Sequence, residues 1–232
     1  MNDISNEQKL YDLIKEYNYK GVLQLIDDTG MEISKEHWFV SMDLINNNGK
    51  LNNFNPFQTL DDVEAAQQTF DYLTYVYKNQ VGEKQFKDDA KEMVKMAIEI
   101  DDTFSLDILS KHGANEYNTK QLNKAMWKLA KFATRTIYGK NNFEIVNFFL
   151  DKGVKADDTT VKHAIKINDK ELLHRIILDR KTELSDDFIK SLVNDNPKHQ
   201  YALELIGKVL LNKKLETETC KPKQKQQLRM KI

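Results

Sequence analysis

The 232-residue sequence has one cysteine, three prolines and eight glycines, and each shortage excludes a class of protein. The single cysteine, Cys220, permits neither an intrachain disulfide nor a cysteine-based zinc site within one chain. With so few glycines and prolines, the turns that β-sandwiches and β-barrels need roughly every 8–12 residues are missing. Collagen-like and disordered classes are excluded as well, because 40% of the residues are apolar and can fill a core.

Long hydrophobic runs are also lacking. No apolar stretch approaches the ~20 residues of a membrane span. The polar segment from Met1 to Glu7 lacks the basic and apolar regions of a cleaved signal peptide. We therefore expect a cytoplasmic protein, or one that is secreted without a cleaved signal.

Arginine is scarce, and charge is uneven along the chain. There are 31 lysines and 4 arginines, and the net charge is −1. Arginine binds phosphate in a bidentate manner, so its scarcity argues against a specific nucleic-acid partner. Residues 213–232 hold seven basic and two acidic side chains, net +5, which leaves −6 for the rest. These numbers predict an acidic domain over residues 1–212 and a basic, disordered tail over 213–232.

Apolar residues recur with helical spacing almost throughout, which predicts an all-α fold. Four stripes stand out: Leu10, Leu13, Ile14 and Tyr17; Val63, Ala66, Phe70, Leu73 and Tyr77; Met93, Met96, Ala97 and Ile100; Leu122, Ala125, Met126, Leu129 and Phe132. We expect one helix to open at Ser34 and a long one to run from about Leu60 to Asn79.

Three segments repeat one pattern, and they begin near Leu13, Ala97 and Ala164. In each, a helix meets Asn or Asp at a tight corner, and a second short helix follows. Asn and Asp suit a corner because they tolerate left-handed backbone and bond their own main chain. The second helices of the first two segments end at Gly30 and Gly113, and Gly153 ends a similar helix over residues 141–154. Glycine is the preferred left-handed residue after a helix. The segment that begins near Ala164 has Lys181 where this glycine would be. The chain therefore reads as stacked antiparallel helix pairs.

These residues resemble the ankyrin repeat. Residues 141–154 are the closest match, to the second helix of the family and its exit glycine. Residues 108–115 resemble another exit, and Thr159 to Ala164 is similar to the Thr-Pro-Leu-His-x-Ala opening, with Thr160 and Lys162 departing from it. The resemblance implies an ankyrin-like helical-repeat solenoid. Its spacing departs from the family, since Gly113 and Gly153 lie 40 residues apart instead of the usual ~33.

Residues 31–90 fit no repeat. An Asn-rich stretch over residues 46–57 precedes the long helix expected from Leu60. The segment is either an irregular insertion or an eroded repeat pair within the 1–212 domain.

Catalytic and ligand-binding motifs are missing from the sequence. No two histidines have the i, i+4 spacing of a metalloprotease. Phosphate-binding glycine loops, nucleophile elbows and kinase signatures are missing too. We therefore expect no catalytic residue, no metal and no cofactor.

Aromatic residues are the strongest candidates for contact with a partner. Four are hard to assign to a core from the sequence pattern, and we take them as candidate protein-binding residues: Trp38, Phe54, Phe57 and Trp127. Phe54 and Phe57 flank Pro56 in a polar stretch, where they either pack back onto the protein or anchor a partner. The sequence thus favours a non-enzymatic protein-interaction module whose partner it does not identify.

Two further hypotheses remain open. Ankyrin-like proteins rich in Lys and Asn occur in intracellular bacteria and large viruses, so the resemblance implies a host-targeted effector as one specific version. Deletion of residues 213–232 would then abolish export and leave folding intact. The alternative is an enzyme, a hydrolase or transferase, with its site in residues 31–90 and with His37, Trp38 and Asp43 as the residues to test.

Overall fold

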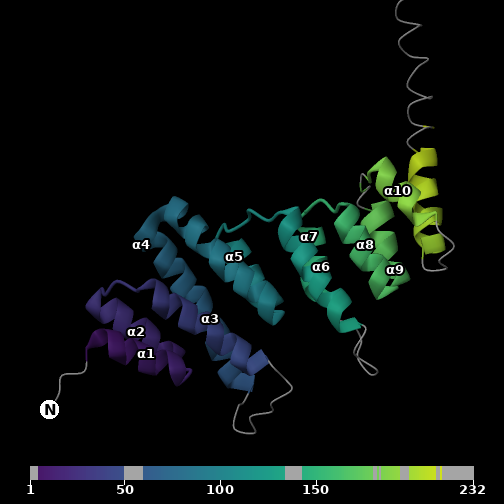
Figure 1. Ribbon diagram of the computed structural model, residues 1–232. Helices are drawn as coiled ribbons and strands as arrows, with labels where there is room; N and C mark the ends of the chain where they lie inside the picture. Colours follow the sequence, from purple (N-terminus) through teal and green to yellow (C-terminus); the bar gives the residue numbers. More distant parts are fainter. Residues whose placement is uncertain are drawn as a thin grey trace, which may run out of the picture. The chain divides into compact units, whose positions relative to one another are not determined.

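Figure 1 shows the fold of the chain, which is known from a computed structural model. The structure describes residues 5–49, 60–133, 143–179, 182, 184–193, 199–212 and 215. All regular structure in these ranges is helical, and none of them contains a β-strand. The all-α prediction is therefore confirmed for these ranges. The chain divides into two compact units, Met1–Glu116 and Tyr117–Ile232.

The first unit begins with a helix pair. Its members are α1 (Asn6–Lys15) and α2 (Tyr19–Thr29). At the corner between them Tyr17 has a φ of 55°, and Asn18 accepts a hydrogen bond from the Gly21 N–H at 2.9 Å. Gly30 ends α2 with a φ of 60°. The corner and the glycine exit lie where the sequence predicts them, although the left-handed corner residue is Tyr17 and not an Asn.

Residues 31–90 contribute to a second helix pair. α3 (Lys35–Gly49) packs against α4 (Leu60–Ile100), while α1 contacts α3 and α2 contacts α4. Gly82, with φ 80° and ψ 163°, interrupts the helical path of α4. The described parts of this segment thus pack into the first unit as a helix pair.

The second part of α4 forms a further pair with α5 (Thr103–Lys111). Asp101 lies at the corner with a φ of 67°. Asp102 caps α5 by accepting a hydrogen bond from the Ser105 N–H at 3.0 Å, and its own N–H donates to the Ala97 carbonyl. An acidic residue in left-handed conformation followed by an acidic cap is the corner that the sequence predicts.

The second unit repeats this construction. Its helices are α6 (Thr119–Ala133), α7 (Glu144–Asp151), α8 (Asp158–Ile167), α9 (Lys170–His174), the π-helical turn η1 (Arg175–Asp179), α10 (Asp186–Leu192) and a helix over residues 199–212. α6 packs against α7 and α8 (Figure 1). Asn168, with a φ of 60°, and the cap residue Asp169 form the corner between α8 and α9.

The exits of α5 and α7 have the same hydrogen bonds, displaced by 40 residues. The N–H groups of His112, Gly113 and Ala114 donate to the carbonyls of Ile108, Ser110 and Leu109. Those of Lys152, Gly153 and Val154 donate to the carbonyls of Phe148, Leu150 and Phe149. Gly113 and Gly153 both have positive φ, 101° and 78°. One left-handed glycine therefore satisfies the last carbonyls of each helix.

Polar side chains join neighbouring helices of the second unit at their N-terminal ends. Thr119 Oγ1 donates to the Lys155 carbonyl at 2.8 Å, and Asn123 Nδ2 donates to both Asp157 carboxylate oxygens at 3.1 Å. The Ser185 N–H, at the start of α10, donates to Asp158 at 3.0 Å. The N-terminal ends of α6, α8 and α10 thus lie next to one another at one end of the second unit.

The segment that resembles the ankyrin opening follows that pattern only in part. Val161 and Ala164 are fully buried, as a core-facing position requires. Thr160 is the buried threonine, whereas Thr159 is exposed. Thr160 forms a reciprocal capping box with Asp157 and donates to Asn123 Oδ1 at 2.6 Å.

Each unit has its own apolar core. The largest fully buried side chains of the first unit include Trp38, Phe70, Phe86 and Met93, and Phe149 is fully buried in the second. The predicted stripes supply much of this core: Leu10, Ile14, Ala66, Leu73, Ala97, Leu122 and Met126 are all buried. Among the described residues, no helix is long and apolar enough to span a membrane.

Candidate protein-binding surface

Trp38, one of the predicted partner-binding residues, belongs to the core of the first unit. It is 0% exposed, and its indole N–H donates to Thr74 Oγ1 at 2.9 Å. Its ring lies 4.7 Å from the Tyr77 ring, nearly parallel to it, and 5.5 Å from the Phe86 ring. A side chain without exposed surface makes no contact with a partner in this conformation, so Trp38 acts as a packing residue.

The residues of the enzyme alternative do not form a common site. His37 is 1% exposed, and its Nδ1 accepts a hydrogen bond from the Ser34 N–H at 3.1 Å. Burial lowers the pKa of His37, against the opposing effect of the Glu7 carbonyl and the Glu7 and Glu36 carboxylates. Asp43 is exposed, and no hydrogen bond or ion pair among the described residues joins it to His37 or Trp38. His37 therefore fixes the start of α3 by bonding to Ser34.

Two predicted aromatic contacts lie outside the described residues. These are Phe54 and Phe57, and most of the basic segment at 213–232 lies outside them as well. Their role in binding stays a prediction.

Trp127 is the candidate that the structure places at the surface. It lies on α6 and is 52% exposed. The Lys131 ammonium sits 5.1 Å from the centre of its ring, a cation–π distance. Tryptophan is one of the residue types enriched among the few side chains that contribute most of the binding free energy in protein interfaces.

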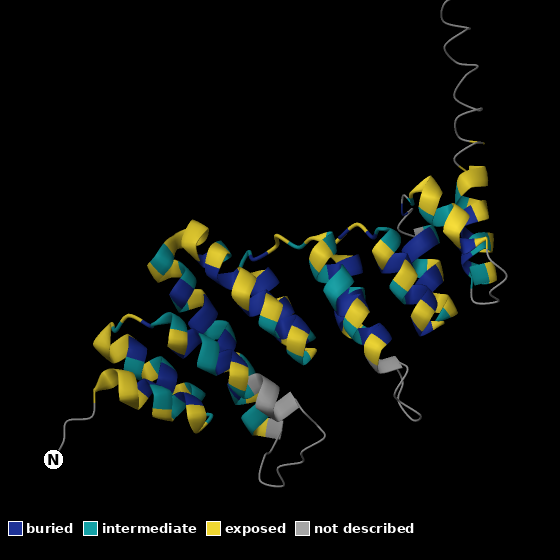
Figure 2. Cartoon of the chain, in the orientation of Figure 1, coloured by how far each residue is buried: buried dark blue, intermediate teal, exposed yellow. Residues whose placement is uncertain are grey.

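Lysines surround Trp127 on the same helix face. Lys120, Lys124 and Lys131 are spaced at i−7, i−3 and i+4 from Trp127, and α6 contains no acidic residue. The neighbouring helix α8 adds Lys162 and Lys166, both exposed. We call this set, Lys120, Lys124, Trp127, Lys131, Lys162 and Lys166, the α6 surface. Figure 2 marks the exposed positions along α6 and α8 in yellow.

The α6 surface belongs to a unit whose net charge is opposite to that of the other. Met1–Glu116 contains 22 acidic and 11 basic residues, net −11. Tyr117–Ile232 contains 14 acidic and 24 basic residues, net +10. Within the second unit, residues 117–212 alone are net +5, with 17 basic and 12 acidic side chains. The net charge of −6 over residues 1–212 is therefore the sum of −11 in residues 1–116 and +5 in residues 117–212.

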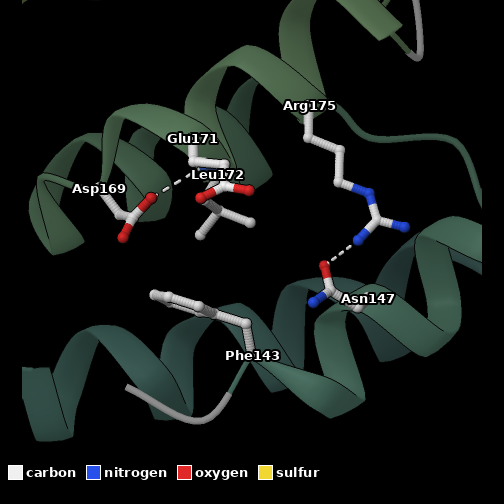
Figure 3. A pocket seen from close by; sticks show the side chains of 6 residues that line it. All are labelled: Phe143, Asn147, Asp169, Glu171, Leu172 and Arg175. Carbon is white, nitrogen blue, oxygen red and sulfur yellow. Dashed lines mark hydrogen bonds between the residues drawn. The ribbon is translucent and has the colours of Figure 1, made fainter. Parts of the chain in front are cut away.

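A small polar pocket opens between α7 and α9 (Figure 3). Its volume is about 140 Å³, and it is lined by Phe143, Asn147, Asp169, Glu171, Leu172 and Arg175. Arg175 donates to Asn147 Oδ1 and to Asp151 Oδ1, the latter at 2.5 Å. Asp169 caps α9 through the Leu172 N–H. The pocket is smaller than the ~300 Å³ of a typical ligand site. The hydrogen bonds of Arg175 to Asn147 and Asp151 link one helix pair to the next.

A second pocket lies at the last helix pair and is apolar. It measures about 260 Å³ and is lined by Ile177, Thr182, Leu184, Ile189, Ile206, Val209 and Leu210. Thr182 Oγ1 donates to the Ile176 carbonyl at 2.6 Å, so its hydroxyl is bonded within the chain. The lining thus offers a ligand mainly apolar contacts.

The polar clusters of the first unit also connect helices. Asp71 on α4 bonds Lys111 at 2.6 Å and His112 Nε2 at 2.5 Å, both near the end of α5. Burial alone would raise the pKa of Asp71, but these two hydrogen bonds lower it. Within the described part of the chain, no group of three or more His, Cys, Asp or Glu side chains is arranged to hold a metal ion.

No protein-family model, curated protein or solved structure matches this chain.

Proposed function

We propose that the chain is a non-enzymatic protein-binding module built from stacked ankyrin-like helix pairs. The α6 surface is the observation that carries the proposal: a half-exposed tryptophan lies among five lysines on two adjacent helices. Stacked helix pairs support such a surface because their exposed positions vary without disturbing the core.

Backbone geometry supports the ankyrin-like part of the proposal. The corners at Asp101–Asp102 and Asn168–Asp169 both pair a left-handed residue with an aspartate cap. The exits at Gly113 and Gly153 have matching hydrogen bonds. Arg175, at the start of η1, bonds to Asn147 of α7 in the second unit, much as Asp71 of α4 bonds to Lys111 of α5 in the first. A host protein as the partner is the version that the sequence resemblance implies.

Site-directed photocrosslinking tests the proposal. A benzophenone amino acid replaces Trp127 in the full-length chain, and a second variant carries it at Tyr75, which is 55% exposed on α4. The expected result is a protein adduct at position 127, suppressed by excess unmodified chain, with a weaker or different adduct at position 75. Equal labelling at both positions, or adducts that excess chain does not suppress, would contradict the proposal.

A further inference from the structure

Lysines and Trp127 form a continuous strip along α6. Lys120 and Lys131 are 11 residues apart, which corresponds to about 17 Å along a helix. The apolar face of α6, formed by Leu122, Met126 and Leu129, is buried in the second unit. The strip is therefore the polar side of a helix that the fold holds in place, and its one large apolar group is the Trp127 ring.

The lysines of α8 lie alongside this strip. The bonds from Asn123 to Asp157 and from Thr119 to Lys155 place the starts of α6 and α8 together, so the two helices run in the same direction. Counted from these bonds, Lys162 comes level with Trp127, and Lys166 comes level with Lys131. Burial, and then the charges of Lys166 and Lys162, lower the pKa of His163 between them, which agrees with a positive local potential.

The two acidic side chains at the start of α8 are already bonded within the unit. Asp157 accepts hydrogen bonds from Asn123 and from the Thr160 N–H. Asp158 accepts from the N–H of Ser185 and from its hydroxyl, the latter at 2.5 Å. Both carboxylates therefore serve as caps at one end of the strip.

We propose that the α6 surface binds an acidic segment of a partner protein, one that carries an apolar side chain to cover Trp127. This inference rests on the protein-binding function proposed above and specifies the chemistry of the partner. Carboxylates on the segment would pair with the lysines, and the apolar side chain would remove the exposed indole from water. An extended segment of about five residues spans the strip.

Other anionic partners are less well matched to this surface. The strip has no arginine, which is the preferred bidentate binder of phosphate. It has one aromatic ring, whereas single-stranded nucleic acid binds to successive stacking platforms. A membrane-bound helix needs an exposed apolar face, and the apolar face of α6 is buried.

A second copy of the chain also matches less well, although its first unit is acidic. Several carboxylates of that unit are bonded to lysines of the same unit: Asp71 to Lys111, Asp88 to Lys91, and Asp89 and Glu92 to Lys35. The carboxylates of a separate acidic segment are not bonded to lysines of the first unit, so those lysines do not compete with the α6 surface for them.

The test measures binding of a defined probe to the full-length chain. The probe is a fluorescein-labelled peptide of alternating glutamate and leucine pairs, and polarisation is measured at about 50 mM and about 300 mM NaCl. The test variants are Trp127→Ala and the double substitution Lys120→Glu with Lys166→Glu. A charge-matched control carries Lys190→Glu with Lys208→Glu, two exposed lysines outside the α6 surface. Circular dichroism verifies that each variant folds.

Specific binding predicts a distinct pattern across these variants. The probe binds the unaltered chain, and both test variants lose roughly tenfold or more in affinity. The control loses less than about threefold, and added salt weakens binding without abolishing it. An equal loss in the control, or no loss in Trp127→Ala, would overturn the proposal.

Competing probes decide the class of partner. Single-stranded DNA or anionic phospholipid vesicles that bind more tightly, with the same sensitivity to the variants, would also overturn the proposal. Salt-dependent self-association in analytical ultracentrifugation that is lost in the double variant would also overturn the proposal, because it would identify a second copy of the chain as the partner. A photocrosslinked protein at position 127 together with failure of the acidic probe would refute the acidic segment and leave the protein-binding function standing.

Discussion

Met1–Glu116 and Tyr117–Ile232 share a backbone design and differ in charge. Both contain a corner that ends in an aspartate cap, and both contain an exit with a left-handed glycine and the same three hydrogen bonds. Their net charges are −11 and +10. Each also has one tryptophan, buried in the first unit and half exposed in the second.

This comparison separates two kinds of constraint. Residues at corners and exits are restricted by backbone conformation, because few side chains tolerate positive φ. Exposed helix positions have no such restriction, so one scaffold can carry an acidic surface in one unit and a basic surface in the other. Function in such a chain is expected on the exposed helix faces.

The largest expected effect comes from the two cores. Phe70→Ala in the first unit and Phe149→Ala in the second should each lower the free energy of unfolding by about 3–5 kcal/mol, because both rings are fully buried. Hydrogen exchange followed by mass spectrometry should show the loss of protection mainly in the unit that carries the substitution. Equal loss of protection in both units would show that they unfold together, and would contradict the assignment of a separate core to each unit.

The two tryptophans should respond differently to the same substitution. Trp38→Phe removes a buried hydrogen bond to Thr74 and part of the stacked ring area, so we expect a loss of about 1–2 kcal/mol. Trp127→Phe changes a half-exposed side chain and should stay within about 0.5 kcal/mol. Urea denaturation followed by circular dichroism measures both, and similar losses would contradict the assigned burial.

The two exit glycines should be equivalent. Gly113→Ala and Gly153→Ala place a Cβ on a residue with positive φ, and each should cost about 1 kcal/mol. Gly207→Ala is the control, since this residue lies in the helix at 199–212 with open space around its Cβ position, and it should stabilise the chain by about 0.5–1 kcal/mol. Unequal costs at the two exits would argue against a shared design.

The smallest expected effect is a pH dependence in each unit. The pKa values of His37 and His163 are lowered in the folded chain, chiefly by burial. Their contribution to stability is therefore full above the unfolded pKa of about 6.5 and is lost as the pH falls toward the folded pKa. Denaturation at about pH 7 and about pH 5.5 should show this loss.

Single substitutions assign the pH effect to its unit. His37→Gln should reduce the loss in the first unit only, and His163→Gln in the second only. A loss that neither substitution reduces would mean that other groups dominate the titration in this range.

Much of the fold could be predicted from the sequence because its signals are local. Helical stripes, Asp and Asn corners and exit glycines depend on residues within a few positions of one another. The burial of Trp38 could not be predicted, because it depends on Thr74, Tyr77 and Phe86 on another helix. The long helix expected from about Leu60 to Asn79 ends close to the break at Gly82, which interrupts the helical path of α4.

The candidate surface was predicted in part. The sequence indicates Trp127 as a candidate protein-binding residue, but it does not show that α8, with Lys162 and Lys166, lies beside α6. The opposite charges of the two units are present in the sequence, yet the boundary after Glu116 has no proline or glycine cluster to mark it. The sign of the net charge summed along the sequence nevertheless changes between residues 1–116 and 117–232.

Acrylamide quenching of Trp127 is the most direct test of the proposed binding surface. In a Trp38→Phe variant Trp127 is the only tryptophan, and a Trp127→Phe variant supplies the value for a buried indole. The measurement is made with and without the protein captured by crosslinking at position 127. We expect the bound partner to lower the quenching of Trp127 toward the value for a buried indole. Unchanged quenching in a saturated complex would contradict it.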